Sequence, residues 1–323
     1  MQKTRIKKWR YYLKWTLWVL LVQIILVNIS GAIYAYKFTH FYDHPPTVTS
    51  SQNILNKTWK LFVGPSFYKN VYEPEPSFPY ESISLKTSDD ILIDGWYSPT
   101  DSSKGCVILI HGYTTNKSYL VNEAAKFKQW GYTVLLIDLR AHGKSSGHTT
   151  SFGIKETEEV SKAFEFAQAK GHKRIILYGI SLGAGICIKT VAENNQVRPF
   201  AIIADMPFGT LHNHFRSRAR TLGFPTEPFA FLVTMWIGVE RGFNGFRHNI
   251  ALYAKNVKCP VLLEWGANDR FVMQSEMDNL YVNLASTNKK LVIYPDAGHY
   301  SFLQADQAEW EKQMQAFLAS LTN

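Results

Sequence analysis

The chain has 323 residues, 46% of them hydrophobic, and a formal net charge of +9 at pH 7. This length suits one domain with a large core plus an additional segment, and the composition excludes a disordered protein. Six of the positive charges lie in the first 14 residues, which contain no acidic residue. The charge therefore belongs to a short N-terminal arm, which argues against a nucleic-acid-binding protein.

After this basic tail of residues 1–14, residues 15–36 contain no charged side chain. A helix over these 22 residues would be about 33 Å long, enough to cross the hydrocarbon core of a bilayer. Trp15 and Trp18 at one end and Tyr34 and Tyr36 at the other are typical of the two membrane interfaces. The pattern predicts a transmembrane helix that is retained as a signal anchor.

Six cations precede this segment, whereas only Lys37 follows it closely. This asymmetry predicts a cytoplasmic N-terminus in the cell membrane, with the rest of the chain on the extracytoplasmic side. Two alternatives stay open. Ser30 and Ala32 fit the small-residue positions of a cleaved signal peptide, although the apolar stretch is longer than a typical signal core. A buried core helix is the other alternative, and the flanking cations disfavour it.

Residues 37–80 contain six prolines and are predicted to form a stalk and entry segment with little regular structure. Residues 81–323 are predicted to form the folded domain. Short β-rich runs there alternate with segments of helical periodicity. The eight runs are 82–87, 91–97, 106–110, 132–138, 174–178, 200–204, 261–265 and 290–294. We expect an α/β fold with an eight-stranded, mostly parallel sheet, helices on both faces and an antiparallel hairpin from the first two runs.

Residues 208–250 interrupt this alternation, because they contain no clear strand and are rich in phenylalanine and arginine. We interpret them as a small helical cap over the carboxyl ends of the strands. The alternative is a pair of amphipathic helices packed laterally, whose aromatic residues belong to the core.

The run 174–178 leads directly into Gly179, Ser181 and Gly183, a G-x-S-x-G pentapeptide. A serine hydroxyl needs an exposed position on a tight strand-to-helix turn, near a base and backbone donors, to become a nucleophile. The pentapeptide alone is a weak signal, so its context decides. Asp269 and His299 follow the last two runs, and their order after Ser181 is that of an α/β-hydrolase triad.

With these motifs the chain resembles the α/β-hydrolase superfamily over about residues 80–320. The matching stretches are HGY at 111–113, DLRAHG at 138–143, GISLG at 179–183, PVLLEWGAND at 260–269 and AGH at 297–299. Within the superfamily it looks most like membrane-anchored esterases, lipases and acyl-thioesterases. The resemblance implies Ser181, Asp269 and His299 as catalytic residues, and the backbone N–H groups of Tyr113 and Leu182 as oxyanion donors.

Some of these assignments have rivals. Asp205 and Asp296 compete with Asp269 for the acid, and we prefer Asp269 because it follows a strand at the catalytic edge. His142 is the rival base, but it precedes Ser181 in the chain. Glu264 is unexpected, since a strand buried on both faces rarely carries a carboxylate.

We therefore expect hydrolysis of carboxylic esters or thioesters of acyl or lipid-like substrates, through an acyl-enzyme and without a metal or cofactor. Three cysteines, Cys106, Cys187 and Cys259, show no metal-ligand spacing and are expected to be free thiols. A serine peptidase of the aminopeptidase kind is the main alternative, although Glu227 and Glu240 are the only carboxylates in the insertion that could hold a substrate amine. A non-catalytic binding module is the third reading.

Overall fold

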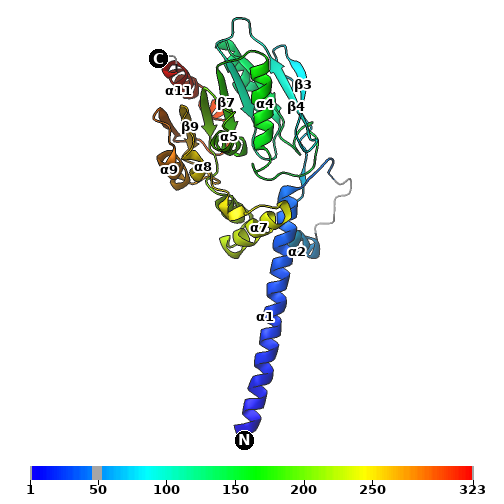
Figure 1. Ribbon diagram of the computed structural model, residues 1–323. Coiled ribbons are helices and arrows are strands. Elements are labelled where there is room, and N and C mark those ends of the chain that lie inside the picture. Colours follow the sequence, from blue (N-terminus) through cyan, green and yellow to red (C-terminus); the bar gives the residue numbers. More distant parts are fainter. Residues whose placement is uncertain (1, 46–52, 322–323) are drawn as a thin grey trace.

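The computed structural model describes residues 2–45 and 53–321, with side chains from Lys8 onward. Its main sheet has eight strands in the order β10-β9-β8-β7-β5-β6-β4-β3 (Figure 1). The strands are β3 (Glu81–Lys86), β4 (Leu92–Ser98), β5 (Cys106–Ile110), β6 (Thr133–Ile137), β7 (Ile175–Ile180), β8 (Ala201–Asp205), β9 (Val261–Gly266) and β10 (Lys289–Tyr294). All eight predicted runs are strands.

The sheet is parallel from β10 to β6, and β4 and β3 extend it antiparallel at one edge. The expected hairpin of β3 and β4 is therefore confirmed. Every residue of β5, β6, β7, β8 and β9 is buried, which explains their uninterrupted apolar sequences. The predicted α/β-hydrolase architecture is correct.

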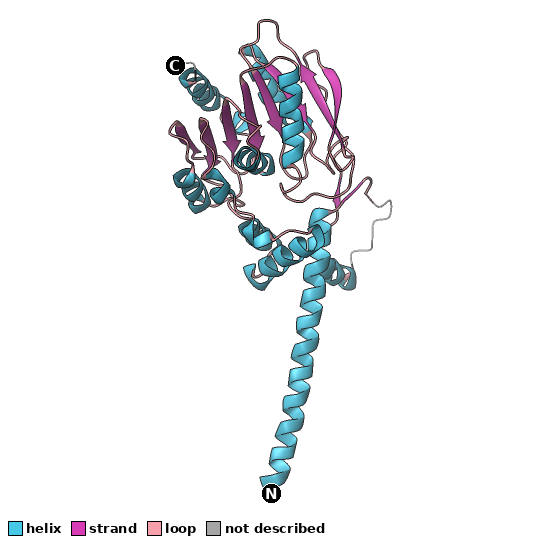
Figure 2. Ribbon diagram, viewed as in Figure 1, coloured by secondary structure: helices cyan, strands magenta, loops and turns pink. Residues whose placement is uncertain are grey.

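Helices cover both faces of the sheet, as Figure 2 shows. On one face α4 (Thr157–Ala169) packs beside α5 (Leu182–Glu193). On the other, α3 (Val121–Gln129) and α11 (Gln307–Ser320) meet through the rings of Phe127 and Trp310. Shorter helices complete the domain: η1 (Lys117–Leu120), η2 (Gly245–Arg247), α8 (Ile250–Ala254), α9 (Gln274–Asn283) and α10 (Phe302–Ala305).

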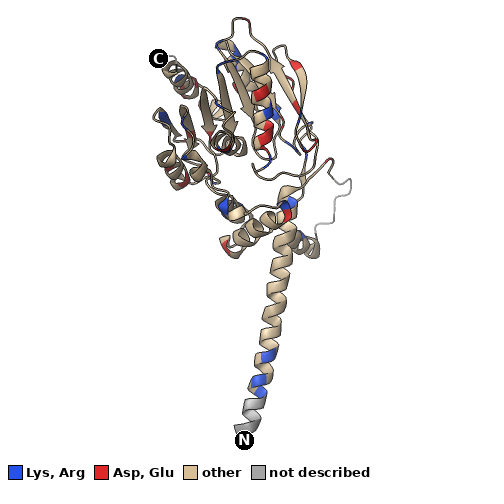
Figure 3. Cartoon of the chain, in the orientation of Figure 1, with Lys and Arg blue, Asp and Glu red and all other residues tan. Residues whose placement is uncertain are grey.

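The N-terminal helix α1 (Gln2–Thr39) projects from the domain as a long rod (Figure 1). Its part Lys8–Thr39 is the one described helix that is long and apolar enough to cross a membrane. In Figure 3 the blue of Lys and Arg colours the turns of α1 next to its grey N-terminal end. Its last two turns differ from this exposed rod, because Tyr34, Ala35 and Phe38 are buried in the domain. The predicted span 15–36 thus ends inside the protein.

The predicted stalk contains more regular structure than expected. Helix α2 (Ile54–Val63) lies beside α1, and the short strands β1 (Phe41–Tyr42) and β2 (Phe67–Tyr68) pair in parallel. The expectation of little regular structure is therefore wrong for these elements, while residues 46–52 lie outside the described part. Prolines flank these elements and do not interrupt them, so the high proline content of the segment did not reveal that it contains a helix and two strands.

The insertion forms two helices, α6 (Leu211–Leu222) and α7 (Thr226–Arg241), which pack on each other. Helix α7 also packs along the end of α1. Several of the cap's aromatic rings, including Phe215, Phe224 and Phe229, contact Tyr34 or Phe38 of α1. These rings are therefore core of the junction between α1 and the cap.

Candidate active site

Ser181 lies between the end of β7 and the start of α5, on a sharp turn. Its backbone has φ 54° and ψ −109°, a conformation that non-glycine residues rarely adopt. Such strain persists only where the surrounding structure imposes it. Here the N–H of Ser181 donates to the carbonyl of Asp205 at 2.8 Å, so the neighbouring strand fixes the turn.

The two glycines of the pentapeptide are required by backbone contacts. A Cβ on Gly183 would lie 2.3 Å from the carbonyl oxygen of Ile110, and one on Gly179 would lie 2.5 Å from the carbonyl carbon of Gly183. These neighbours are main-chain atoms that cannot rotate away. The G-x-S-x-G spacing is therefore what allows α5 to start against β5 and to present the serine.

The structure brings Ser181, His299 and Asp269 together in one hydrogen-bonded chain. Ser181 Oγ lies 2.9 Å from His299 Nε2, and His299 Nδ1 lies 2.7 Å from Asp269 Oδ2. A carboxylate accepts hydrogen bonds, so Nδ1–H donates to Asp269 and Nε2 is left to accept the proton of Ser181. The N–H groups of Phe271 and Val272 donate to Asp269 Oδ1 at 2.7 and 3.0 Å, which orients the buried carboxylate.

The rival residues lie elsewhere. Asp296 is exposed, and His142 is buried with Nδ1 bonded to the carbonyl of Arg140 at 2.8 Å. His111 ties its own turn to the loop after β6, since its Nδ1 donates to the carbonyl of Gly112 at 2.7 Å and its Nε2 accepts the N–H of Leu139 at 3.0 Å. Burial lowers the pKa of His111 to about 4 and that of His142 to about 3, so both imidazoles are neutral.

Asp205 and Glu264 sit opposite each other on β8 and β9, both fully buried. Tyr178 donates a hydrogen bond to Asp205, and Tyr294 donates one to Glu264. Asp205 Oδ1 and Glu264 Oε2 have no other partner in the described chain. Burial, and for Asp205 also the charge of Glu264, raises the pKa of both carboxyls, which favours one shared proton between the two unpartnered oxygens. Glu264 therefore belongs to a buried carboxyl pair.

The loop after β5 approaches the serine closely. A Cβ on Gly112 would be 3.5 Å from Cβ of Ser181, and the N–H of the next residue, Tyr113, has no acceptor among the described residues. The N–H of Leu182 is the first of α5, where helix N–H groups lack partners within the helix. The ring of Tyr113 is buried, and its hydroxyl donates to the carbonyl of Phe38 in α1 at 2.7 Å.

A buried lysine, Lys117 of η1, is surrounded by carboxylates from the segment before β3, from β4 and from the DLRAHG stretch, and the sequence did not reveal this cluster. The carboxylates of Glu73, Asp94 and Asp138 converge, as they would around a metal ion. Lys117 Nζ occupies that position, at 2.7, 2.7 and 2.8 Å from the three. The ammonium already supplies the positive charge, so the cluster is an ion-pair network that anchors the loop.

Arg218 of α6 is a further residue that sequence reasoning did not single out from the cap arginines. Its guanidinium lies 5.6 Å from the ring centroid of Tyr113 and 4.8 Å from that of Phe271, whose ring in turn packs on His299. Burial lowers its pKa, and no carboxylate of the described residues pairs with it. His214, its neighbour in α6, is kept neutral because burial, Arg218 and His299 lower its pKa.

Comparisons with known proteins identify relatives of the same fold. Residues 101–231 match the family described as serine aminopeptidase, S33, and residues 241–320 match the dienelactone hydrolase family. A monoacylglycerol lipase of Mycolicibacterium smegmatis is 23% identical over 67% of this chain and 88% of its own. An uncharacterized membrane protein of Saccharomyces cerevisiae, YNL320W, is 24% identical over 68% of this chain and 74% of its own. The structure of a Pyrococcus furiosus esterase, Pf2001, superposes with a TM-score of 0.64 at 24% identity, over 87% of this chain and 98% of its own.

Proposed function

We propose that this chain, a member of the α/β-hydrolase superfamily of the esterase and lipase kind, is a serine hydrolase that cleaves carboxylic ester or thioester bonds. The observation that carries the proposal is the hydrogen-bonded chain from Ser181 through His299 to Asp269. It supplies a nucleophile, a base within reach of its proton, and an acid that fixes the tautomer of the base.

In the first step Ser181 Oγ attacks the carbonyl carbon of the substrate while His299 Nε2 takes the hydroxyl proton. Asp269 stabilises the imidazolium through the Nδ1–H hydrogen bond. The imidazolium then gives its proton to the leaving alcohol or thiol, which departs and leaves Ser181 acylated. Water, deprotonated by His299, then attacks the acyl-enzyme. The imidazolium returns this proton to Ser181 Oγ as the bond to the acyl group breaks, which releases the carboxylic acid and restores the serine.

The N–H groups of Tyr113 and Leu182 are the proposed donors to the oxyanion. Leu182 directly follows Ser181, and Tyr113 follows Gly112, which lies against Ser181. The N–H of Tyr113 has no other acceptor in the described structure. Each donor is worth roughly 10²- to 10³-fold in rate, because it points at charge that develops only in the transition state.

Acyl or lipid-like esters are the proposed substrates. The name of one relative, a monoacylglycerol lipase, and the attachment of the domain to an apolar helix support this class. The aminopeptidase reading, which the description of one matching family favours, needs a carboxylate to hold the substrate amine. Glu227 already faces His212 at 3.0 Å and Arg216 at 3.7 Å, and the partly buried cation Arg218 repels an ammonium beside the site.

The proposed location is the cell membrane, with a cytoplasmic N-terminus and the hydrolase domain outside. The packing of α1 supports an uncleaved anchor. Cleavage after Ala32 would cut α1 between Ser30, whose hydroxyl bonds to the carbonyl of Phe62 at 2.6 Å, and Tyr34, which is buried. Protease digestion of sealed spheroplasts tests the orientation: the domain should be degraded from outside, and protection of the domain would contradict it.

Labelling with a fluorophosphonate tests the catalytic assignment in the full-length protein. Wild type and Ser275→Ala, whose serine is exposed on α9, should label equally, whereas Ser181→Ala should not label. Equal labelling of Ser181→Ala would remove Ser181 from its role. Labelling of none of the three would favour the binding module.

Turnover then separates the two enzymatic readings. Short-chain p-nitrophenyl esters and acyl-coenzyme A thioesters should be hydrolysed, with aminoacyl p-nitroanilides turned over at least 100-fold more slowly. A preference for the anilides would favour the peptidase.

A further inference from the structure

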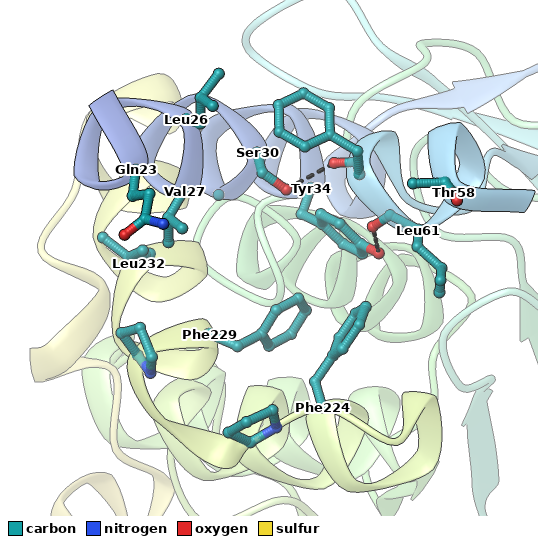
Figure 4. A pocket seen from close by; sticks show the side chains of 14 residues that line it. Gln23, Leu26, Val27, Ser30, Tyr34, Thr58, Leu61, Phe224, Phe229 and Leu232 are labelled. Atoms are coloured by element: carbon teal, nitrogen blue, oxygen red, sulfur yellow. Dashed lines mark hydrogen bonds between the residues drawn. The ribbon is translucent and has the colours of Figure 1, made fainter. Parts of the chain in front are cut away.

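An apolar cavity lies where α1 meets α2 and the cap, away from Ser181. Its volume is about 560 Å³, and its wall includes Leu26, Val27, Leu61, Phe224 and Phe229 (Figure 4). None of its lining residues is charged. We call it the α1–α2–α7 groove.

Of the four polar side chains along this groove, those of Ser30, Tyr34 and Thr58 already have partners within the protein, whereas that of Gln23 is exposed. Tyr34 donates to the carbonyl of Leu61 at 2.7 Å, and Ser30 to that of Phe62 at 2.6 Å, so both close the end of α2 (Figure 4). Thr58 donates to the carbonyl of Ile54 at 3.0 Å within α2. Beyond Gln23, a polar ligand would lose its hydration here without gaining a hydrogen bond from an unpartnered side chain, whereas a hydrocarbon chain incurs no such cost. The groove therefore suits an apolar ligand.

The position of the groove along α1 places it at the depth of the bilayer. The uncharged segment 15–36 is about as long as the hydrocarbon core is thick, so a membrane that covers it reaches the last turns of α1. These turns also pack on the hydrolase domain, so they contact both lipid and protein. Groove residues from Gln23 to Tyr34 belong to this segment. Helix α2 carries exposed Ile54, Leu55 and Trp59 together with two lysines, a composition typical of a helix that lies in the interface.

We infer that the α1–α2–α7 groove binds one acyl chain of a membrane lipid and so docks the hydrolase domain on the bilayer surface. The site is separate from the catalytic one. Phe38, whose ring packs on Phe215 at 5.2 Å, stands between the groove and Tyr113, and its carbonyl accepts the Tyr113 hydroxyl. The inference does not depend on the chain being a hydrolase.

The test uses full-length protein in phosphatidylcholine nanodiscs that contain a trace of phosphatidylcholine with a diazirine at the acyl terminus. After irradiation, peptide mapping by mass spectrometry should find adducts on residues 224–232 and on α2. Val27→Trp fills the groove from a position that is 46% exposed and should lower these adducts at least fivefold. Leu61→Trp fills it from α2 and should act in the same way.

The matched control is Ile25→Trp, because Ile25 is equally exposed on α1 but does not line the groove. Adducts in this variant should equal those of wild type. Adducts confined to the free part of α1, or equal loss in Val27→Trp and Ile25→Trp, would overturn the inference. A dimeric chain with unlabelled groove peptides would also overturn it, since a second copy would then cover the groove.

A second inference rests on Arg218 and on the proposed function. A cation that is partly withdrawn from water normally has a carboxylate or phosphate partner, and none of the described residues supplies one. The guanidinium instead lies over the rings of Tyr113, in the proposed oxyanion loop, and of Phe271, which packs on His299. It donates a hydrogen bond to the neutral ring of His214, at 3.5 Å. We propose that Arg218 pairs with a carboxylate or phosphate group of the substrate and is a specificity-determining residue.

Binding to Ser181→Ala protein tests this without requiring turnover. Calorimetry should show that mono-octyl glutarate and octyl phosphate bind more tightly than neutral octyl acetate, and the two anions distinguish the carboxylate from the phosphate. Adding Arg218→Gln should weaken the preferred anion roughly 10- to 100-fold, as expected for a charge-assisted hydrogen bond. Arg220→Gln, an exposed arginine of the same helix, should change nothing. An anion affinity that is insensitive to Arg218→Gln would overturn the proposal. Failure of the wild-type protein to label with fluorophosphonate would contradict only the proposed function.

Discussion

The surroundings of Ser181 and the junction of α1 with α2 and α7 are held together by different interactions. Around Ser181 the backbone is closely packed and the side chains form short hydrogen bonds. A Cβ on Gly183 would lie 2.3 Å from a main-chain oxygen, and His299 Nδ1 lies 2.7 Å from Asp269 Oδ2. At the junction, Ser30 and Tyr34 attach α2 to α1 by hydrogen bonds, but α1 meets the cap mainly through rings, such as Tyr34 with Phe229 at 5.0 Å. The first arrangement tolerates almost no displacement, whereas aromatic packing adapts to modest changes. We therefore expect substitutions near Ser181 to act on rate, and substitutions at the junction to act on stability.

The largest expected effect is that of Asp269→Asn. Losing the carboxylate favours the wrong tautomer of His299, so kcat for a p-nitrophenyl ester should fall about 10⁴-fold with little change in Tm. Asp296→Asn is the control, because Asp296 is exposed and should leave kcat unchanged. A fall of less than tenfold in Asp269→Asn would assign the acid to another residue.

At the junction, Phe38→Ala should have the opposite profile. Removing this buried ring should cost about 3–5 kcal/mol of unfolding free energy. The kcat per folded molecule should change less than tenfold. Both are measured in detergent, by thermal unfolding and by active-site titration, with Ile29→Ala on the exposed part of α1 as the control. A loss of kcat as large as that of Asp269→Asn would show that the two regions are not separable.

The carboxyl pair under the site gives a smaller, pH-dependent effect. Burial raises the pKa of Glu264 to about 7 in the folded protein. Its contribution to stability is therefore fully present below the unfolded pKa of about 4.3 and is lost as pH rises through the folded pKa. The unfolding free energy of wild type should fall between about pH 5 and pH 7, by up to about 1.4 kcal/mol per pH unit, and thermal unfolding should show the matching decline in Tm. Glu264→Gln, which needs no proton, should flatten this decline. A decline of the same slope in the variant would place the cause elsewhere.

The sequence alone determined the sheet and the positions where chemistry could occur. Parallel strands buried on both faces must be continuous apolar runs, so β5 to β9 were visible in the sequence. The partly exposed edge strands β3, β4 and β10 were recognised from their β-rich residues. The pentapeptide around Ser181 is recognisable because a tight strand-to-helix turn requires its glycines. The ends of the last two strands are also visible in the local sequence, and Asp269 and His299 follow them. Asp269 and His299 could therefore be named, although their distance from Ser181 could not.

Only the tertiary structure decided what each isolated charged or apolar residue meets. The sequence offers no reason for Glu264 in a buried strand, and the structure shows Asp205 opposite it on the adjacent strand. The sequence also did not single out Lys117, which the structure surrounds with three carboxylates. The last turns of α1 read as membrane span, yet they pack into the cap more than 180 residues further along the chain. Such contacts join segments that are distant in sequence, and one-dimensional periodicity records which face of a segment is apolar but not which neighbour covers it.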